Sequence, residues 1–230
     1  METKRLWSEW LKREQRYELY QSGDQQEVDL LFVQDGDDYL QLGGIGELLQ
    51  EYETAKRALA IILVPPGRSQ ERYDYYHPNG NQHEAYLSFF YQELLPEVEK
   101  NFSAQGKRIQ KRGLLGDSLG GAVNLAIAAK QPNLWTHLLF QSAAFTNENF
   151  QQVENLMSKW SIYQMVGEKE DSFVSPITNE PLHILSNNRL MSDLLTNRGA
   201  NVTYIEHNTD HLWDVWRQDL PRALSYFLYN

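Results

Sequence analysis

Residues 113–129 constrain the fold of this chain more than any other segment. A short apolar run at 113–115 leads into Gly116-Asp117-Ser118-Leu119-Gly120-Gly121, and a helix-like run follows at 122–129. A strand, a tight turn with glycines two residues before and after a serine, and a helix make the pattern of a nucleophile elbow, G-x-S-x-G. Side chains at the glycine positions would collide as strand and helix approach. The segment therefore predicts a strand-to-helix turn that exposes the Ser118 hydroxyl.

Apolar runs of strand length alternate with helix-like segments along most of the chain. The strand candidates are residues 28–33, 59–64, 113–115, 137–140, 162–166 and 202–205. Nearly continuous apolar runs predict strands covered on both faces, as in a parallel sheet. Residues 84–101, with a kink expected at Pro96, and residues 187–197 have the apolar spacing of helices. This alternation predicts a three-layer α/β fold with a mostly parallel central sheet.

Length and charge limit the classes of protein that this chain can be. With 230 residues and no repeat or low-complexity linker, we expect a single domain, residues 1–230. The net charge of −10 argues against nucleic acid and against an anionic membrane surface as partners. The basic cluster at residues 107–112 is interpreted as a solvated turn before the strand that begins at Gly113.

Several sequence signals are missing, and their absence shapes the expected chemistry. The chain has no cysteine, which excludes a thiolate nucleophile and a cysteine-ligated zinc site. The first residues include no secretory segment, and the longest apolar run, residues 58–64, is too short to span a bilayer. Residues 43–46 lack the G-x-G-x-x-G spacing of a dinucleotide loop, and no H-E-x-x-H motif occurs. We expect a cytoplasmic protein without cofactor or catalytic metal.

In open parallel sheets, ligands bind beyond the carboxyl ends of the strands. This rule selects the loops that begin at Asp35, Pro65, Ser118, Ser142, Gly167 and His207. A serine nucleophile needs an adjacent base, which is usually a histidine that follows the last strand. His207 and His211 meet that condition. We favour His211, because it lies further into the loop and opens an amphipathic segment at 212–216.

The acid of a triad would follow the preceding strand. The loop at residues 167–171 supplies acidic candidates directly after the strand at 162–166. Glu170 and Asp171 are not separated by first principles. Asp210 is a weaker candidate, because adjacent side chains in a loop tend to diverge from one another. Acid-rich loops are also common on solvated surfaces. Only the position of this loop, between a strand end and the histidine loop, supports a triad acid in it.

An oxyanion hole needs two backbone N–H groups that converge on the reacting carbonyl. One is expected from Leu119, directly after the nucleophile. The other is expected from Asp37, in the loop that Asp35 and Gly36 begin. An Asp-Gly pair is also common in simple turns, so that interpretation stays open for this loop.

With these residues placed, the chain resembles an esterase family of the α/β-hydrolases that includes enterochelin (siderophore) esterases and esterase D. The similar segments, from about residue 28 to the C-terminus, are residues 32–36, 71–75, 93–96, 116–121, 167–170 and 211–217. The resemblance implies Ser118 as nucleophile, His211 as general base and Glu170 as the acid. Many relatives have histidine where this chain has Asp117, a departure that bears on substrate preference.

The resulting hypothesis is a serine carboxylic-ester hydrolase that acts on a small-molecule ester, without nucleic-acid or membrane partner. A non-catalytic binding protein on the same fold is the alternative, since fold does not imply function, and the same triad also serves thioesters and amides. Substrate and oligomeric state are not read from the sequence. Aromatic residues of two loops either line an acyl or aryl pocket or simply pack, and the sequence leaves both open: Tyr73, Tyr75, Tyr76, Phe145, Phe150 and Trp160. Arg68 and Arg72 either meet an acidic group or face solvent, and solvent-facing arginine is the more common case.

Overall fold

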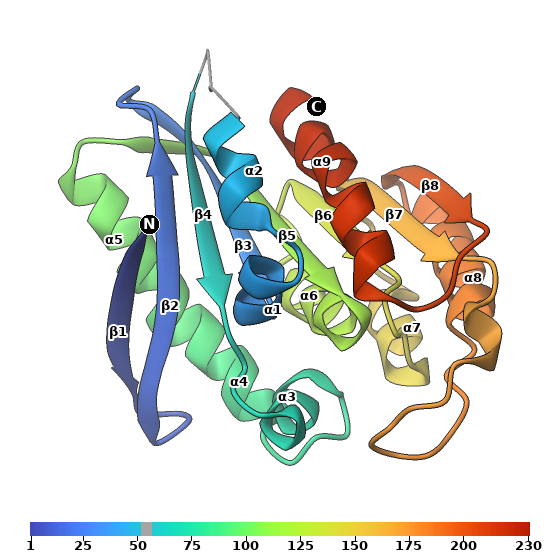
Figure 1. Ribbon diagram of the computed structural model, residues 1–230. Helices are drawn as coiled ribbons and strands as arrows, with labels where there is room; N and C mark the ends of the chain where they lie inside the picture. The colour runs from blue at the N-terminus through green and yellow to red at the C-terminus, as the bar shows by residue number, and fades with distance from the viewer. Residues whose placement is uncertain (52–56) are drawn as a thin grey trace.

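The computed structural model describes residues 1–51 and 57–230, and its described strands form one sheet in the order β1-β2-β4-β3-β5-β6-β7-β8 (Figure 1). The strands are β1 (Glu2–Ser8), β2 (Arg13–Ser22), β3 (Glu27–Gln34), β4 (Ala58–Val64), β5 (Arg108–Asp117), β6 (His137–Gln141), β7 (Ser161–Gly167) and β8 (Asn201–His207). From β4 to β8 all neighbours pair in parallel. The predicted α/β class with a mostly parallel sheet is confirmed.

Helices cover both faces of this sheet. They are α1 (Gly36–Gln41), α2 (Ile45–Glu51), α3 (Ser69–Tyr76), α4 (His83–Phe89), α5 (Leu95–Ala104), α6 (Ser118–Lys130), α7 (Asn147–Val153), α8 (Ile184–Asn197) and α9 (Trp213–Tyr229). Two short segments add a π turn, η1 (Phe90–Leu94), and a 3₁₀ turn, η2 (Glu170–Ser172). In Figure 1, α1, α2 and α9 lie in front of the sheet. Among the described helices, none is long and apolar enough to cross a membrane.

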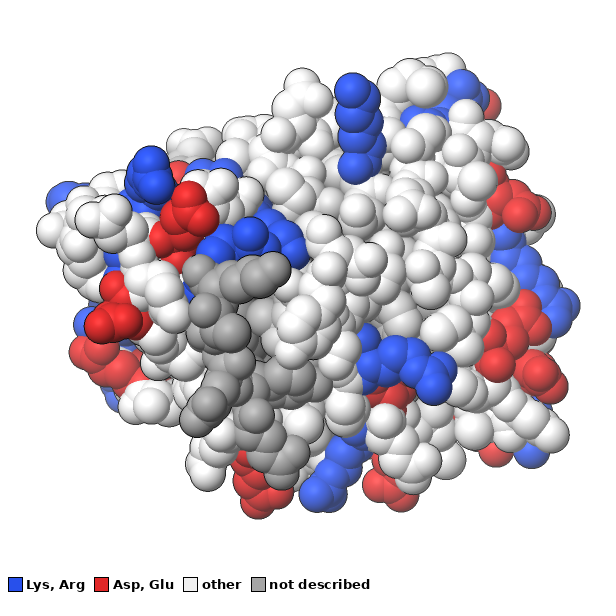
Figure 2. Space-filling model, turned by 90° about the horizontal axis from the view of Figure 1, so that it is seen from above, with Lys and Arg blue, Asp and Glu red and all other residues white. Residues whose placement is uncertain are grey.

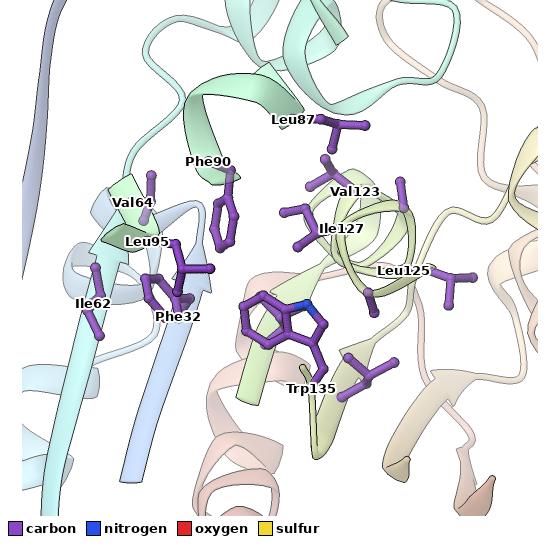
Figure 3. Packing of buried hydrophobic residues seen from close by; sticks show 14 of the residues in the cluster. Phe32, Ile62, Val64, Leu87, Phe90, Leu95, Val123, Leu125, Ile127 and Trp135 are labelled. Atoms are coloured by element: carbon purple, nitrogen blue, oxygen red, sulfur yellow. The ribbon is translucent and has the colours of Figure 1, made fainter. Parts of the chain in front are cut away.

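Alternate side chains of β3 divide the core into two layers. Leu30 and Phe32 pack into the cluster that α3 to α8 cover, whereas Leu31 and Val33 pack into the cluster under α1, α2 and α9. In the first layer, the Phe32 ring centre lies 5.2 Å from that of Phe90 and 6.0 Å from that of Trp135 (Figure 3). Burial on both faces explains why the parallel strands are continuously apolar.

Two antiparallel strands, β1 and β2, extend the sheet at one edge, and the sequence analysis expected no strand before residue 28. Their polar residues make these strands hard to recognise in the sequence. A strand with one face exposed to solvent alternates polar and apolar residues instead of forming a continuous apolar run. Lys4 and Arg5 illustrate this, since β1 is mostly exposed or half-buried.

The expectation of a solvated basic turn before Gly113 is wrong. Strand β5 begins at Arg108, so most of that cluster lies inside the strand. Its cations are bonded there: Arg112 Nε lies 2.7 Å from Glu99 Oε1, and Lys111 Nζ donates to the Phe227 carbonyl at 3.0 Å. Charge patterning alone does not distinguish a loop from the half-exposed start of a strand whose cations find partners on neighbouring helices.

The helix expected at residues 84–101 is interrupted before Pro96, not at it. Helix α4 ends at Phe89, the π turn η1 follows, and Pro96 occupies the first turn of α5. Proline lacks an N–H and its ring clashes with the carbonyl four residues earlier, so the strain falls on the preceding turn.

Seen from above, the molecule shows no concentration of one charge. In Figure 2, Lys and Arg side chains lie beside Asp and Glu side chains around the margin of that face. This distribution offers no single basic patch on the face in view.

Candidate active site

The predicted turn at Ser118 exists, and its glycines are required by close contacts. Strand β5 ends at Asp117 and α6 begins at Ser118, whose φ of 47° lies in the left-handed region. A Cβ on Gly116 would lie 2.5 Å from the carbonyl carbon of Gly120. A Cβ on Gly120 would lie 2.6 Å from Asp35 Oδ2. A left-handed serine held between crowded glycines is the geometry of a nucleophile elbow.

Ser118, His211 and Glu170 form one continuous chain of hydrogen bonds. His211 Nε2 lies 3.0 Å from Ser118 Oγ, and His211 Nδ1 lies 2.8 Å from Glu170 Oε2. The three residues come from the ends of β5 and β7 and from the loop before α9. They are 93 and 41 residues apart in sequence, so only the sheet topology brings them together. The structure thus brings together all three predicted triad residues.

The two acidic neighbours at the end of β7 point in different directions. Glu170 is fully buried, and its Oε1 accepts hydrogen bonds from the Gly167 N–H and the Ser142 hydroxyl, both at 2.7 Å. Asp171 instead accepts from the Ser186 N–H at 2.8 Å, at the start of α8. This geometry separates two candidates that the residues alone left equal, and Glu170 is the one that faces His211.

His207 lies outside this hydrogen-bond chain. It ends β8, and its carbonyl accepts the N–H groups of Glu168 and Thr209 at 2.7 Å each. The backbone of His207 thus holds the loop that carries Glu170.

Ser142 and two aromatic rings support the triad, and the sequence analysis gave them no role. Trp216 Nε1 donates to Ser142 Oγ at 2.9 Å, and the Ser142 hydroxyl donates to Glu170. The His211 ring lies between Phe173, at 4.2 Å between ring centres, and Trp216, at 4.8 Å. Ser142 directly follows β6, so its place at the carboxyl end of a strand was the one signal that marked it.

A pocket of about 560 Å³ opens at Ser118 and His211. Its remaining lining residues are Asp38, Arg72, Asp117, Leu119, Phe173, Ser175, Pro176, Ile177, Leu182, Leu212, Trp213, Asp214 and Trp216. Of the two roles left open for the aromatic residues of the loops, the structure shows packing: Tyr75, Tyr76, Phe145 and Trp160 are buried in the core, and Tyr73 and Phe150 pack against it. Their loops return to the sheet, whereas the loop at 173–182 and the start of α9 form the walls.

Arg72 does not face solvent, contrary to expectation. Its Nε and Nη2 each lie 2.7 Å from a carboxylate oxygen of Asp35, and Nη2 lies 3.5 Å from Asp117 Oδ2. Burial alone would lower the pKa of Arg72, but pairing with Asp35 and Asp117 raises it. Burial, together with the charge of Asp35, raises the pKa of Asp117 well above its ordinary value. The residue beside the nucleophile is therefore part of a buried charged network.

The backbone N–H of Leu119 lies in the first turn of α6, and Leu119 lines the pocket beside Ser118. Free N–H groups and the positive end of the helix dipole favour negative charge at that position. The Asp37 carboxylate, in the first turn of α1, is bound to Arg16 at 2.7 Å, and its neighbour Asp38 is the residue of this turn that lines the pocket. The Asp37 N–H as second oxyanion donor stays a prediction.

A comparison with protein families identifies the family of this chain. The model of a family described as "Putative esterase" matches residues 8–227. The chain belongs to this family. It is also 30% identical over 204 residues to an uncharacterized protein of Bacillus subtilis, YjcH, with 86% of this chain and 84% of that protein covered. The family match begins at Ser8, so it includes β2, whereas the resemblance read from the sequence began near residue 28.

Solved structures share the fold of this esterase-family chain. The enterobactin esterase of Shigella flexneri superposes with a TM-score of 0.75 at 20% identity; all of this chain is covered, and it spans 59% of that enzyme. The siderophore hydrolase EstB of Aspergillus nidulans gives a TM-score of 0.74 at 13% identity, with 98% of this chain and 93% of that chain covered. These likenesses establish an α/β-hydrolase fold.

Proposed function

We propose that this protein is a serine carboxylic-ester hydrolase that works through an acyl-enzyme. The observation that carries the proposal is the hydrogen-bond chain from Ser118 through His211 to Glu170 at the wall of an open pocket. Membership of an esterase family supports the same reaction class. A hydroxyl, an imidazole and a buried carboxylate in this order are what a neutral serine needs to act as a nucleophile.

In the first half-reaction, Ser118 Oγ attacks the ester carbonyl while His211 Nε2 accepts the hydroxyl proton. Glu170 holds the Nδ1–H of His211 and stabilises the imidazolium that forms. His211 then gives the proton to the leaving alcohol, and an ester bond to Ser118 remains. In the second half-reaction, His211 takes a proton from water, the resulting hydroxide attacks the acyl carbonyl, and Ser118 regains its proton.

The negative charge that develops on the carbonyl oxygen needs donors that are already in place. We assign one to the N–H of Leu119, in the first turn of α6, and the second to the N–H of Asp37 in the loop after β3. Both belong to backbone segments whose position is set by the sheet, so they need little reorganisation during the reaction.

The pocket supports an ester with an apolar acyl or aryl part. Leu119, Phe173, Ile177 and Trp213 are among the apolar residues that line it. Short-chain acyl, aryl and siderophore-type esters are the candidate substrates; the last is suggested by the enterobactin esterase and the siderophore hydrolase that share the fold. Thioesters and amides would use the same machinery.

The test combines an activity panel with a covalent probe. Wild-type protein should hydrolyse at least one class of ester and should be labelled by a fluorophosphonate at one serine, which mass spectrometry locates at Ser118. Ser118→Ala should lose both the hydrolysis and the label, with unchanged thermal unfolding. Ser103→Ala, at an exposed serine on α5, is the matched control and should retain both.

An unlabelled wild-type protein without activity on any ester of the panel would support the alternative, a binding protein on a hydrolase fold. Hydrolysis that survives in Ser118→Ala would place the chemistry elsewhere and end the proposal.

A further inference from the structure

The pocket at Ser118 carries more carboxylates than cations. Asp38 in α1, Asp117 at the end of β5 and Asp214 in the first turn of α9 all line it. Arg72 is the one Lys or Arg side chain among the described lining residues. Since these groups come from four separate elements, the excess of acid is a property of the assembled pocket and not of one acidic loop.

The charge of Arg72 is already matched inside the protein. Two nitrogens of its guanidinium lie 2.7 Å from the Asp35 carboxylate, which is 1% exposed, and Nη2 lies 3.5 Å from Asp117 Oδ2. Bidentate pairing with one carboxylate and approach to a second leave little positive potential for a ligand. The arginine in the wall therefore does not make the pocket attractive to anions.

Asp117 adds an acceptor that the protein does not use. Asp117 lines the pocket next to the nucleophile and is 2% exposed, and its buried Oδ1 has no hydrogen-bond partner among the described residues. A buried acceptor without a donor is costly, and a ligand that supplies positive charge or a donor nearby relieves that cost. Even if Asp117 takes up a proton, the carboxylates of Asp35, Asp38 and Asp214 still outnumber Arg72.

The Trp213 indole belongs to the same pocket wall as Asp38 and Asp214. Trp213 precedes Asp214 at the start of α9, and it meets the ring of Tyr39, the neighbour of Asp38, edge to face at 5.1 Å between centres. This contact joins the starts of α1 and α9, which bring Asp38, Trp213 and Asp214 to one pocket. A pocket that holds both an indole and carboxylates is favourable for an alkylammonium group, which can gain cation–π and charge attraction.

We propose that this pocket selects esters that carry a cationic, alkylammonium-type group near the acyl chain and discriminates against esters with an anionic group. The proposal rests on the ester hydrolysis proposed above and names the charge of its substrate. It assigns Asp38, Trp213 and Asp214 to substrate recognition, with Asp117 as the acidic residue nearest to the reacting carbonyl.

The experiment compares three para-nitrophenyl esters with one leaving group and one spacer of three methylenes. Their acyl chains end in a trimethylammonium, a tert-butyl or a sulfonate group, which are similar in shape and differ in charge. At low ionic strength, kcat/KM should fall in that order, with the cationic ester favoured over the anionic ester about tenfold or more. The ratio should shrink in high salt, because the charges near the pocket mouth are screened.

Variants assign the effect to the pocket. Asp38→Asn and Asp214→Asn keep side-chain shape and should each lower the cation-to-anion ratio, and the double variant should bring it close to one. Asp193→Asn removes the same charge from an exposed position on α8 outside the pocket, and it should keep the wild-type ratio. If a pocket variant fails to fold, the cation-to-anion ratio of wild type and its dependence on salt still test the proposal.

The possible results distinguish a failure of the proposed charge selectivity from a failure of the proposed ester hydrolysis. Hydrolysis of the tert-butyl ester that depends on Ser118, together with equal rates for the charged esters, overturns the charge selectivity alone. A preference for the sulfonate ester also overturns it and shows that Arg72 governs recognition. Absence of hydrolysis of all three esters, or hydrolysis that survives in Ser118→Ala, contradicts the proposed function, and the inference falls with it.

Discussion

Ser142 Oγ lies 2.7 Å from Glu170 Oε1, the carboxylate oxygen that does not face His211. Ser142 has a φ of 48°, in the left-handed region, and its hydroxyl also accepts a hydrogen bond from the Trp216 indole. Both oxygens of Glu170 are therefore bonded, one to the imidazole and one to a support that α9 fixes. A buried carboxylate held in this way can orient the imidazole without moving.

Removal of the Ser142 hydroxyl should weaken catalysis without removing a reacting group. We expect Ser142→Ala to lower kcat/KM about tenfold, as for loss of an outer support of a site residue. Ser142→Gly should be equally impaired although glycine suits the left-handed backbone. The two variants are compared by steady-state kinetics across pH, and the acidic limb of the plot of kcat/KM against pH should move. Recovery of activity in the glycine variant alone would assign the role of Ser142 to the backbone.

Glu170 and Asp171 should differ sharply in their effect on activity. Glu170→Gln keeps the shape but loses the charge that stabilises the imidazolium, so kcat should fall by about 10³–10⁴-fold. Asp171→Asn is the matched control, because Asp171 is bonded to Ser186 and not to His211. Its kcat should stay within a few-fold of wild type in the same assay. Equal losses in both variants would contradict the assignment of the acid.

The Asp35–Arg72 pair should show a strong coupling in stability. Arg72→Met leaves the buried carboxylates of Asp35 and Asp117 without a cation, which should cost about 3–5 kcal/mol of unfolding free energy. Adding Asp35→Asn to that variant should restore part of the loss, because one uncompensated charge is removed. Urea unfolding of the two single variants and the double variant gives the coupling energy. Additive effects would show that the close contact carries little energy.

Gly116→Ala should destabilise the elbow, because the new Cβ would lie 2.5 Å from a backbone carbon that cannot rotate away. We expect a loss of about 1–3 kcal/mol, as for an overpacked core site, together with loss of activity. Gly106→Ala is the control: φ there is +72°, but no atom lies within 4 Å of the new Cβ. Its cost should be confined to backbone strain of about 1 kcal/mol, and its activity should be unchanged. Both are measured by urea unfolding.

His137 should make stability fall in mild acid. Burial first, and then the charges of Lys111 and Arg57, lower the pKa of His137 from 6.5 to about 4. Below pH 6.5, His137 therefore binds a proton in the unfolded chain but not in the folded protein. The free energy of unfolding falls until the pH reaches about 4. The full effect of such a shift is about 3 kcal/mol.

In His137→Gln, thermal unfolding should depend less on pH between neutrality and pH about 4 than in wild type. His207→Gln, at a half-buried histidine, controls for the loss of an imidazole. An unchanged pH slope in His137→Gln would show that the pKa of His137 does not differ between the folded and the unfolded protein.

Local patterns predicted the layers and the buried strands, because continuous apolar runs have few structural solutions. The strands expected near residues 28–33 and 59–64 are observed as β3 and β4 within a residue or two. The strands β1 and β2 at one end of the sheet were missed, since their stability comes from pairing and not from an apolar run. The same limit applies to β5, whose charged start is stabilised by partners on other elements.

By itself the sequence determined the α/β class, the turn at Ser118 and the chain order of the serine, acid and histidine candidates. These depend on spacing between near neighbours, which the amino-acid order states directly. Only the tertiary structure decided that Glu170 and not Asp171 meets His211, that Ser142 and Trp216 support that carboxylate, and that Arg72 lies half-buried beside two buried aspartates. Those outcomes depend on side-chain direction and on segments far apart in the chain, which meet because parallel strands bring their carboxyl ends to one edge of the sheet.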